Sequence, residues 1–408
     1  MKNIQVLVLA GGEAKRMRPI TANKNLLPFF GRPLIVHAIE NLKKSGFKDF
    51  IVVVNPQIKE EVKKYLGNVK VVVQKRPLGQ ADAILSAEKE IKDRPLLIVN
   101  ANDFFQPSLF VEFNRKIKNN PDALLVGLKT DCYLSMGYLV VKNGLVERVV
   151  EKPGKGREPS DMIKLVVDFY QKPKILLQFL EKTKSNRDDV YEVAMAKMMK
   201  KGIKFELVKY NDSWATIKYP WDILETAAFF LNEKKKKPII AGEGVKIFEG
   251  AVVKNSYLGK NVIVGNNALV RDSIIEDGCV IGYNTEIARS YVGPNCWFHA
   301  NYIGDSILEE NISFGSGART ANLRLDEKEI VPGRVKMGAI IGSGVRVGIN
   351  TSIMPGVQIG SNSFVGSGLV LEENLKENKF CYLEQKVVVR ENLRKIDLET
   401  RDKFKKKL

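Results

Sequence analysis

The sequence is poor in the residues that most often build metal and disulfide sites. Its 408 residues include only 2 His and 4 Cys. The cysteines have no CxxC spacing, so they predict neither a disulfide framework nor a zinc site; they are Cys132, Cys279, Cys296 and Cys381. No apolar run approaches the ~18 residues of a membrane span. No small-residue cleavage site follows the apolar residues 1–10. We therefore expect a cytoplasmic protein with no membrane partner.

Negative charge is also in short supply, because 65 Lys and Arg face 47 Asp and Glu, for a net charge of +18. Such an excess suits polyanionic partners, namely nucleic acid, acidic lipid or phosphorylated small molecules. Two lysine clusters, Lys234–Lys237 and Lys403–Lys407, hold part of it. Nucleic-acid binding needs aromatic residues among the basic ones, and these clusters contain only Phe404. We interpret them as solvated lysines on a linker and a tail, and expect no nucleic-acid partner.

The first part of the chain alternates between two patterns. Near-continuous apolar runs are typical of strands buried on both faces of a sheet, and the stretches between them have helical periodicity. The runs are residues 4–10, 49–55, 69–75 and 94–100, and the helical stretches are 33–45, 79–92 and 188–201. This alternation predicts βαβ units in a Rossmann-like α/β domain with a mostly parallel sheet.

The pattern changes near residue 238. From there an apolar residue followed by glycine recurs at spacings that are mostly multiples of six, as in Val264-Gly265 and Ile281-Gly282. A six-residue period with one buried aliphatic residue per repeat predicts a parallel β-helix. Residues 318–336 lack the repeat and are expected to form an excursion from it. We predict four segments: 1–232 (the α/β domain), 233–241 (a linker), 242–385 (the β-helix) and 386–408 (a helical tail).

The first predicted strand runs into a loop suited to phosphates, LAGGEAKRMRPITANKNLLP at residues 9–28. Gly11 and Gly12 allow a tight turn that presents backbone N–H groups to an anion. Arg16, Arg18 and Lys24 add positive charge. We expect the nucleotide to contact the residues of this turn, which are Leu9, Ala10, Gly11 and Gly12.

This loop resembles the sugar-1-phosphate nucleotidyltransferase family, whose pattern runs roughly LAGGxGTRLxPLT…K…LLPVxxKPLI. The resemblance continues through LGQADAI at 78–84, so it implies that Gln74 and Gly79 contact the nucleotide. Asp103, in IVNANDFF, matches the aspartate that holds Mg²⁺ in the family. Gly137 in MGYLVV and Glu151-Lys152-Pro153 match the family's sugar and sugar-phosphate motifs.

The resemblance implies a reaction in which a sugar-1-phosphate oxygen attacks the α-phosphorus of a nucleoside triphosphate and pyrophosphate leaves. Both reactants are anions, so such an enzyme mainly positions them and neutralises charge. Arg16 is expected to act on the leaving phosphates, and Lys24 and Lys152 near the α-phosphate and the sugar phosphate. Asp103 is expected to anchor Mg²⁺, which favours a carboxylate together with phosphate oxygens. dTTP and UTP are the favoured nucleotides.

The chain departs from the family pattern in the phosphate loop, in the sugar-binding segment and after Trp214. The departures are Ala14 and Lys15, then Val166 and Asp168, and finally Thr216. Ala14 removes a glycine that adopts positive φ easily. Thr216 stands where the family has a second Mg²⁺ contact, and Asp212 and Asp222 lie near it in sequence. These departures leave open a catalytically weakened homologue.

A second candidate site lies in the β-helix. The segment 296–326 (CWFHANYIGDSILEENISFGSGARTANLRLD) resembles the acyltransferase domains of bifunctional sugar-nucleotide enzymes, and this resemblance implies that the β-helix is left-handed. The resemblance implies that His299 acts as general base on a sugar amine, which suits a neutral imidazole. It also implies that Tyr302 and Asn322 bind the sugar and that Lys336 or Arg346 contacts acetyl-CoA.

Two less active roles remain for this part of the chain. The β-helix alone carries no catalytic content, so it is also interpreted as a surface for homo-oligomerisation or regulation. His299 is then a structural histidine at a corner of the coil. His37, the other histidine, lies on the apolar face of the predicted helix at 33–45 and is expected in the core.

Overall fold

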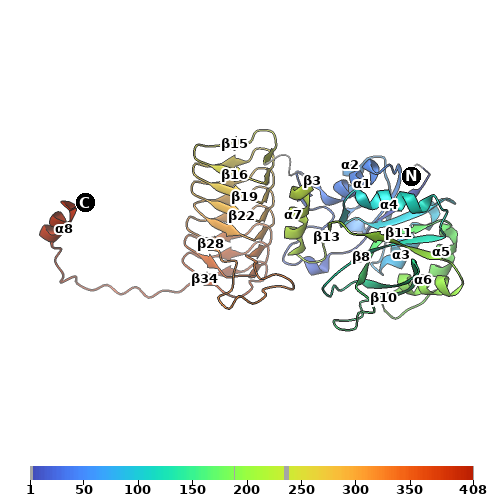
Figure 1. Cartoon of the computed structure of the whole chain (residues 1–408). Helices are drawn as coiled ribbons and strands as arrows, with labels where there is room; N and C mark the ends of the chain where they lie inside the picture. The colour runs from blue at the N-terminus through green and yellow to red at the C-terminus, as the bar shows by residue number, and fades with distance from the viewer. Residues whose placement is uncertain (1–2, 188, 234–238, 408) are drawn as a thin grey trace.

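The computed structural model describes residues 3–187, 189–233 and 239–407. An α/β domain and a β-helix lie side by side (Figure 1), and the C-terminal tail leaves the β-helix on the side away from the α/β domain. The cluster Lys234–Lys237 falls outside the described residues. No helix among the described residues is long and apolar enough to cross a membrane.

The α/β domain is built on a nine-stranded sheet in the order β5-β4-β1-β6-β11-β8-β12-β10-β9. The predicted strands form its parallel half, β5 to β6, whereas the other half is mostly antiparallel. The strands are β1 (Gln5–Ala10), β4 (Asp49–Val54), β5 (Lys70–Val73), β6 (Leu96–Asn100), β8 (Ala123–Lys129), β9 (Gly137–Lys142), β10 (Leu145–Glu151), β11 (Met162–Tyr170) and β12 (Phe205–Tyr210).

Helices cover both faces of this sheet, as continuous apolar strands require. Alternate residues of β1 separate the two cores: Val6 and Val8 pack with α1, α2 and α4, and Leu7 and Leu9 with α3, α5 and α6. The helices are α1 (Leu34–Lys44), α2 (Lys59–Leu66), α3 (Gln80–Ser86), α4 (Ser108–Ile117), α5 (Pro173–Glu181), α6 (Val190–Lys200) and α7 (Asp222–Glu233), with short 3-10 turns at Lys15–Met17, Pro56–Ile58 and Glu88–Glu90.

Two small antiparallel pairs complete the α/β domain. Strands β2 (Pro28–Phe29) and β3 (Arg32–Pro33) form a hairpin, and β7 (Asp103–Phe105) pairs with β13 (Trp214–Thr216). The second pair places Thr216 opposite Asp103, although 113 positions separate them in the chain. Pairing across such a distance was not visible in the sequence pattern.

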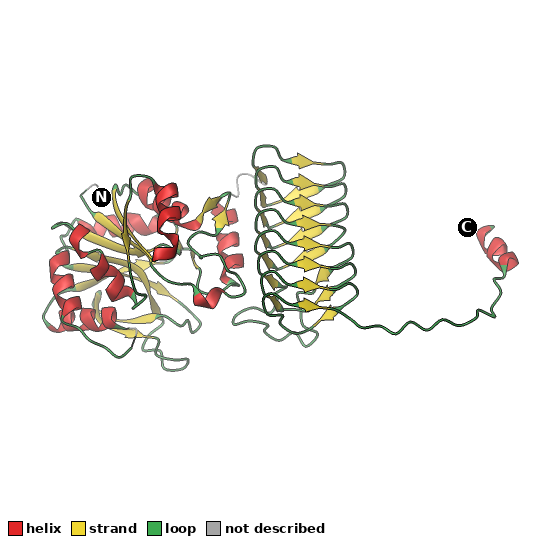
Figure 2. Cartoon of the chain, turned by 180° about the vertical axis from the view of Figure 1, so that it is seen from behind, coloured by secondary structure: helices red, strands yellow, loops and turns green. Residues whose placement is uncertain are grey.

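The second domain winds three parallel sheets into the arrangement of a left-handed β-helix, shown from behind in Figure 2. The first sheet is β14 (Ile239–Ala241), β17 (Ser256–Leu258), β20 (Ile274–Ile275), β23 (Tyr291–Val292), β26 (Ile307–Leu308), β29 (Ile340–Ile341) and β32 (Gln358–Ile359). The second is β15 (Lys246–Ile247), β18 (Ile263–Val264), β21 (Val280–Ile281), β24 (Trp297–Phe298), β27 (Ser313–Phe314), β30 (Arg346–Val347), β33 (Phe364–Val365) and β35 (Phe380–Cys381). The third is β16 (Val252–Lys254), β19 (Leu269–Arg271), β22 (Glu286–Ala288), β25 (Tyr302–Gly304), β28 (Arg319–Thr320), β31 (Ser352–Ile353) and β34 (Val370–Leu371).

The predicted repeat supplies the core of this domain. The aliphatic residues before the glycines stack inward, as Val264 and Ile281 do in consecutive coils, and Phe298 takes the same position in the next coil. The turns use left-handed backbone conformations that asparagine and glycine tolerate best, as at Asn261 and Asn267. The expected excursion follows β28. The coil resumes after it, because Ser313 on β27 pairs with Arg346, the next residue of that sheet, on the far side of the excursion.

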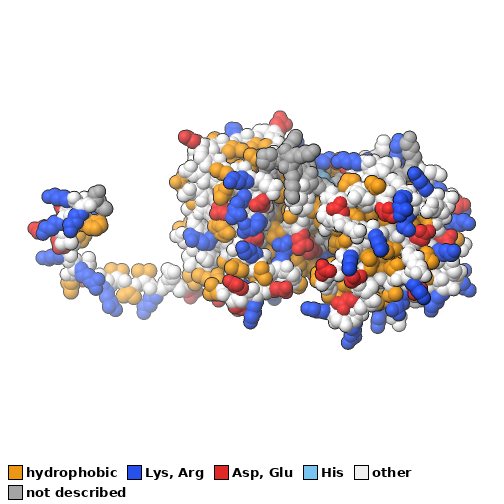
Figure 3. Space-filling view, in the orientation of Figure 1, with side chains coloured by type: hydrophobic (Ala, Val, Ile, Leu, Met, Phe, Trp, Pro, Cys, Tyr) orange, Lys and Arg blue, Asp and Glu red, His pale blue; other side chains and the backbone are white. Residues whose placement is uncertain are grey.

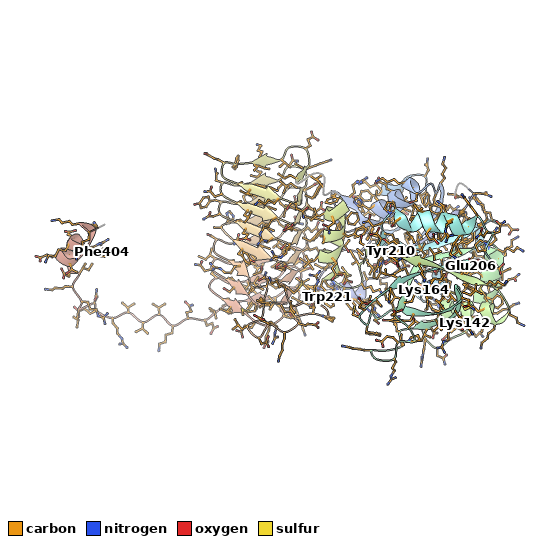
Figure 4. The ribbon with its side chains drawn as sticks, viewed as in Figure 1. Lys142, Lys164, Glu206, Tyr210, Trp221 and Phe404 are labelled. Carbon is orange, nitrogen blue, oxygen red and sulfur yellow. The ribbon has the colours of Figure 1, made fainter. Side chains whose placement is uncertain are left out.

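The tail is less helical than the sequence predicted. Residues 382–397 contain no helix or strand, and α8 covers only Leu398–Lys405. Figure 4 shows Phe404 on this helix, separate from both domains. A short charged helix without an apolar face packed against a neighbour gains little from tertiary contacts, which explains its short length.

The two domains share an apolar core at their interface. Tyr291 of the β-helix stacks on Phe29 with ring centroids 5.2 Å apart, and its hydroxyl donates to the carbonyl of Pro28 at 2.9 Å. Helix α7 lies against the same face in Figures 1 and 2, and its Phe230 belongs to this core. His37 also packs beside Phe230, with ring centroids 5.1 Å apart, as its apolar helix face predicted.

Candidate active site

The phosphate loop begins at the carboxyl end of β1, at the point where the chain order of the sheet reverses. β1 lies between β4 and β6, so the loops after β1 and β6 open on either side of one crevice. Open α/β sheets bind their ligands at such switch points. This arrangement brings Gly11 and Asp103 to the same edge of the sheet.

The turn at Gly11 depends on close contact with Gln74. A Cβ atom on Gly11 would collide with the side-chain oxygen of Gln74. Gln74 is buried, and its amide donates to the carbonyl of Gly79 at 3.1 Å and to the carboxylate of Asp82 at 2.8 Å. A larger residue at position 11 would therefore force the Gln74 side chain to move, and Gln74 joins the two predicted nucleotide-binding segments.

Ala14 adopts φ 54° and ψ 28°, so the loop keeps the left-handed conformation that the family's glycine would provide. An L-residue other than glycine pays about 1–2 kcal/mol for this conformation. Alanine in place of the family's glycine at position 14 thus leaves the left-handed backbone conformation of the turn in place.

A cavity of about 550 Å³ opens above this edge of the sheet. Every residue predicted for nucleotide, sugar phosphate or metal in the α/β domain lines it. These residues are Leu9, Ala10, Gly11, Gly12, Arg16, Lys24, Gln74, Gly79, Asp103, Gly137, Glu151 and Lys152. The volume falls in the ~300–1,000 Å³ range of small-molecule sites. The sequence segments that the motifs singled out therefore converge on one concave surface.

Lys24 and Arg16 supply positive charge from the phosphate loop. The Lys24 ammonium donates to the carbonyl of Ile217 at 3.0 Å. Burial, together with the nearby cations Lys218 and Arg16, lowers the pKa of Lys24 to about 8, against the opposing effect of Asp103. Arg16 is exposed, and its guanidinium carbon lies 5.9 Å from the ring centroid of Tyr219. Both cations are available to an anion in the cavity.

Asp103 is the buried acidic group of the cavity, with 6% of the residue exposed. The amide of Asn100 donates to its carboxylate at 3.1 Å, and Thr216 is a second hydrogen-bond partner. Burial raises the pKa of Asp103, although these hydrogen bonds and the lysines Lys218 and Lys24 favour its charged form. Thr216 therefore lies beside the carboxylate, in the register that the β7–β13 pair imposes.

The two other aspartates considered from the sequence lie outside the cavity lining. Asp212 is exposed and accepts a hydrogen bond from the Ser108 hydroxyl at 2.9 Å. Asp222 accepts from the backbone N–H groups of Lys218 and Tyr219, each at 2.7 Å, at the start of α7. Asp222 thus holds the turn that carries Lys218.

The far end of the cavity carries the residues predicted for the sugar and its phosphate. Lys152 lies 2.9 Å from the carboxylate of Glu151, and its backbone has φ 43°, a strained conformation for lysine. Gly137 pairs with Glu151 across β9 and β10. The Glu151 carboxylate is therefore held between the Lys152 ammonium and the backbone of Gly137, which has no side chain.

In the sugar-binding segment, Asp168 departs from the family pattern, and the structure shows that it forms a buried ion pair. Asp168 is fully buried and accepts from the Lys164 ammonium at 2.6 Å and from the Tyr191 hydroxyl at 2.9 Å. Val166 and Lys164 line the cavity, and Figure 4 shows Lys164 inside the α/β domain. The buried ion pair fixes the lysine below the sugar end of the cavity.

Sequence motifs missed several cavity residues. Lys164, Glu192 and Lys218 line the cavity but are not among the residues predicted for the site. Burial raises the pKa of Glu192 to about 7 and lowers the pKa of Lys218. Lys218 follows Trp214 and Thr216 in the segment WATIKYPWDIL and could have been singled out there. Glu192 lies on α6, whose position over the cavity no local pattern reveals.

The oxygen atoms around Asp103 fit a magnesium ion that takes its other ligands from the phosphates of the substrate. Mg²⁺ binds through one or two carboxylates together with substrate phosphates and water, rather than in an all-protein cage. Asp103 with the neighbouring Thr216 hydroxyl provides such a partial oxygen set. The described residues contain no group of three or more His, Cys, Asp or Glu suited to a metal.

In the β-helix the structure brings Tyr302 and Asn322 together. The Asn322 amide donates to the Tyr302 hydroxyl at 3.4 Å and to the carboxylate of Asp305 at 2.5 Å. Arg289 forms a two-pronged ion pair with the same carboxylate at 2.7 and 2.8 Å. Figure 3 shows Lys and Arg side chains gathered on the face of the β-helix that carries β16, β19 and β22.

The remaining predicted residues of the second site come from different parts of the β-helix, and Arg346 lies on β30 of the second sheet. His299 is exposed at the corner between β24 and β25, and its ring stacks on Trp297 with centroids 5.9 Å apart. Within the described residues, no hydrogen bond joins its imidazole to Tyr302 or Asn322. Lys336 and Arg346 are both exposed. Lys336 lies beside Asn322, because its backbone pairs with Leu323.

The comparisons with known proteins agree with both halves of this description. The nucleotidyl transferase family model matches residues 5–233, and the bacterial transferase hexapeptide model, with six repeats, matches residues 338–373. A bifunctional sugar-1-phosphate nucleotidylyltransferase/acetyltransferase of Sulfurisphaera tokodaii is 30% identical, over 92% of this chain and 99% of its own length. The bifunctional protein GlmU of Methanococcus maripaludis and that of Methanocaldococcus jannaschii are each 29% identical, over 95% of this chain and 99% of their own lengths. The chain belongs to the nucleotidyl transferase family and carries C-terminal hexapeptide repeats.

Proposed function

We propose that the chain transfers a nucleotidyl group from a nucleoside triphosphate to a sugar-1-phosphate, with dTTP or UTP as the nucleotide, and releases pyrophosphate. The observation that carries this proposal is the convergence of the glycine turn, Arg16, Lys24, Lys152 and Asp103 on one cavity. The relatives that match along nearly the whole chain have names consistent with it.

In this reaction the chain neutralises and positions two anions. The turn at Gly11 and Gly12 offers backbone N–H groups to the triphosphate, and Arg16 offsets charge on the leaving β- and γ-phosphates. Lys24 and Lys152 act on the α-phosphate and the incoming sugar phosphate, and Glu151 accepts hydrogen bonds from sugar hydroxyls. One P–O bond forms to the sugar phosphate as the bond to pyrophosphate breaks.

Asp103, with Thr216 beside it, is the group that would hold Mg²⁺. When bound, the ion neutralises charge on phosphate oxygens. Asn100 fixes the carboxylate through its 3.1 Å hydrogen bond. Mg²⁺ binds the ionised carboxylate, so the hydrogen bonds from Thr216 and Asn100 and the charges of Lys218 and Lys24, which favour that form, oppose the effect of burial on Asp103.

The β-helix is proposed to carry a second activity, transfer of an acetyl group from acetyl-CoA to the amine of an amino-sugar phosphate. The support is the Tyr302–Asn322–Asp305 cluster beside exposed cations, and the exposed His299 nearby. His299 takes the proton of the attacking amine as the C–N bond forms and the thiolate of CoA leaves. Lys336 or Arg346 meets the phosphates of CoA.

The β-helix is also proposed to join copies of the chain into a homo-oligomer. Its second sheet exposes large apolar side chains, with Trp297, Phe364 and Phe380 each more than half exposed. Phe364 and Phe380 are neighbours in this sheet, with ring centroids 6.3 Å apart, and exposed apolar surface is typical of protein–protein contacts.

A matrix of substrates tests the first proposal. Pyrophosphate release is measured for four nucleoside triphosphates against glucose-, mannose- and glucosamine-1-phosphate, with Mg²⁺ and with EDTA. We expect one nucleotide and one sugar phosphate to dominate, and EDTA to stop turnover. Release that is equal for all pairs, or that needs no sugar phosphate, contradicts the proposal.

Release of CoA thiol in the presence of glucosamine-1-phosphate tests the second activity. We expect the His299→Ala variant to lose acetyl transfer and to keep pyrophosphate release, because His299 lies in the other domain. If the unsubstituted chain turns over no acetyl-CoA, the alternative in which the β-helix is a scaffold is favoured.

A further inference from the structure

The β-helix holds the phosphate loop of the other domain through a buried carboxylate. Glu309 follows β26 and is 5% exposed. Its carboxylate accepts hydrogen bonds from the backbone N–H of Thr21 at 2.9 Å, from the backbone N–H of Ala22 at 2.7 Å and from the Thr21 hydroxyl at 2.9 Å. The backbone N–H of Ser343, on the next coil, donates at 2.8 Å. This carboxylate thus links two coils of the β-helix to residues that lie between Arg16 and Lys24.

The next coils of the β-helix contact the same loop. A Cβ atom on Gly342 would lie 2.8 Å from the carbonyl oxygen of Pro19, so the loop approaches the backbone of this coil directly. Arg18 lies 3.4 Å from the carboxylate of Glu377 at the surface. The loop therefore rests on the β-helix along residues 18–22, and Glu309 is the buried polar contact among these.

The sequence position of Glu309 is unusual within the repeat. At this corner the coils of the first sheet carry Gly242, Gly259, Glu276, Gly293, Glu309, Gly342 and Gly360, each directly after its strand. Only the two glutamates break the run of glycines. Both turn toward the α/β domain: Glu276 accepts from the backbone N–H of Gly31 at 2.9 Å. These substitutions are explained by contacts with the other domain, because the coil itself is built with glycine here.

We propose that Glu309 is a positioning residue for nucleotidyl transfer, one that fixes the phosphate loop and thereby the Lys24 ammonium from outside the α/β domain. Thr21 and Ala22 lie two or three residues before Lys24, whose ammonium reaches the carbonyl of Ile217 at the cavity. Residues 21–24 are thus held at one end by the Glu309 carboxylate and at the other by the hydrogen bond from Lys24 to Ile217. Because a misplacement of about 1 Å can lower a rate by about 10²-fold, anchoring of this kind acts on turnover.

The Glu309→Gln variant tests this role with little change in volume. A glutamine presents one oxygen and one NH₂ group where the carboxylate presents two acceptors. One of the sites that faces N–H donors therefore becomes a donor itself. We expect kcat for pyrophosphate release to fall about 10-fold or more, with a much smaller change in KM for the nucleotide. Hydrogen exchange of the peptide that contains residues 19–24 is expected to become faster in the full chain.

Glu276→Gln is the matched control, because Glu276 is a buried carboxylate at the same corner that contacts the β2–β3 hairpin instead of the phosphate loop. We expect it to speed exchange around Gly31 and to leave exchange at 19–24 and kcat unchanged. Thr21→Val keeps both backbone donors and removes only the hydroxyl, so it is expected to lower kcat less than Glu309→Gln does.

These experiments distinguish a positioning role of Glu309 from a role in overall stability. The predicted change in kcat rests on the proposed function, and the experiments also distinguish a failure of that function. Equal losses of kcat in Glu309→Gln and Glu276→Gln, or unchanged exchange at 19–24 in Glu309→Gln, overturn the positioning role. A lower concentration of nucleotide-binding sites with unchanged kcat per site also overturns it, because that result indicates partial unfolding. Failure of the unsubstituted chain to release pyrophosphate refutes the proposed function instead, while the exchange measurement still decides whether Glu309 orders the loop.

Discussion

The lowered pKa of Lys24 predicts how nucleotidyl transfer depends on pH. With a pKa of about 8, the ammonium is about 90% protonated at pH 7 and about 10% protonated at pH 9. Only the charged form offsets phosphate charge, so kcat/KM for the nucleotide is expected to fall roughly 10-fold between these values, with a slope that approaches −1. In kcat the same decline moves to higher pH, because bound phosphate favours the charged amine.

The test is the initial rate of pyrophosphate release from pH 6 to pH 10 at low and at saturating nucleotide. Lys24→Arg is the decisive variant, since a guanidinium stays charged with a pKa above about 12. We expect its rate to be lower throughout but flat between pH 7 and pH 9. Lys218→Arg is the control, because burial lowers the pKa of Lys218 as well. A decline that persists in Lys24→Arg and disappears in Lys218→Arg refutes the assignment.

The same lysine has a consequence for stability. The unfolded chain keeps this amine protonated up to about pH 10.5, whereas the folded chain releases the proton near pH 8. The unfolded state therefore binds more protons between these values, and the contribution of Lys24 to stability rises with pH across this window. Below it, the buried charge costs up to roughly 3 kcal/mol. Lys24→Met is thus expected to be inactive and more stable at pH 7, measured as a higher midpoint of urea unfolding; a large loss of stability would contradict this.

Two further substitutions test the metal ligand and the glycine turn. In Asp103→Asn we expect pyrophosphate release to fall on the order of 10²–10³-fold without loss of thermal stability, because burial already disfavours the charged carboxylate; survival of activity would show that the metal is held elsewhere. In Gly11→Ala the new Cβ collides with Gln74, so nucleotide affinity measured by calorimetry is expected to fall about 10-fold. The double variant Gly11→Ala/Gln74→Ala is expected to recover part of this loss relative to Gln74→Ala alone, and strictly additive losses would exclude the collision as the cause.

The sequence predicted the parts of the fold that depend on local patterns. Buried strands such as β1 and β6 are recognisable as continuous apolar runs, because both of their faces are covered. The coils of the β-helix are recognisable as a six-residue repeat, because one inward-facing aliphatic residue recurs on each face of the coil. The glycine turn and its cations were recognisable for the same reason, since the motif is contiguous. The helical tail was predicted too long, because charged sequence shows helix propensity but not the absence of a packing partner.

Features that depend on distant segments were not predicted. The Thr216 hydroxyl reaches Asp103 only through the β7–β13 pair, and Glu192 reaches the cavity only because the first residues of α6 line it. The role of Glu309 illustrates the limit most clearly. Its replacement of a repeat glycine is visible in the sequence, yet its partners lie 287 and 288 positions away in another domain. Such contacts follow from the docking of the two domains, which no local pattern encodes.

The location of a bound nucleotide is the most direct test of the proposed site. A crystal structure of the full chain with a non-hydrolysable nucleoside triphosphate and Mg²⁺ is predicted to show the phosphates against the turn at Gly11, within reach of Arg16 and Lys24, and the ion on Asp103. Phosphates bound away from these residues would contradict the account.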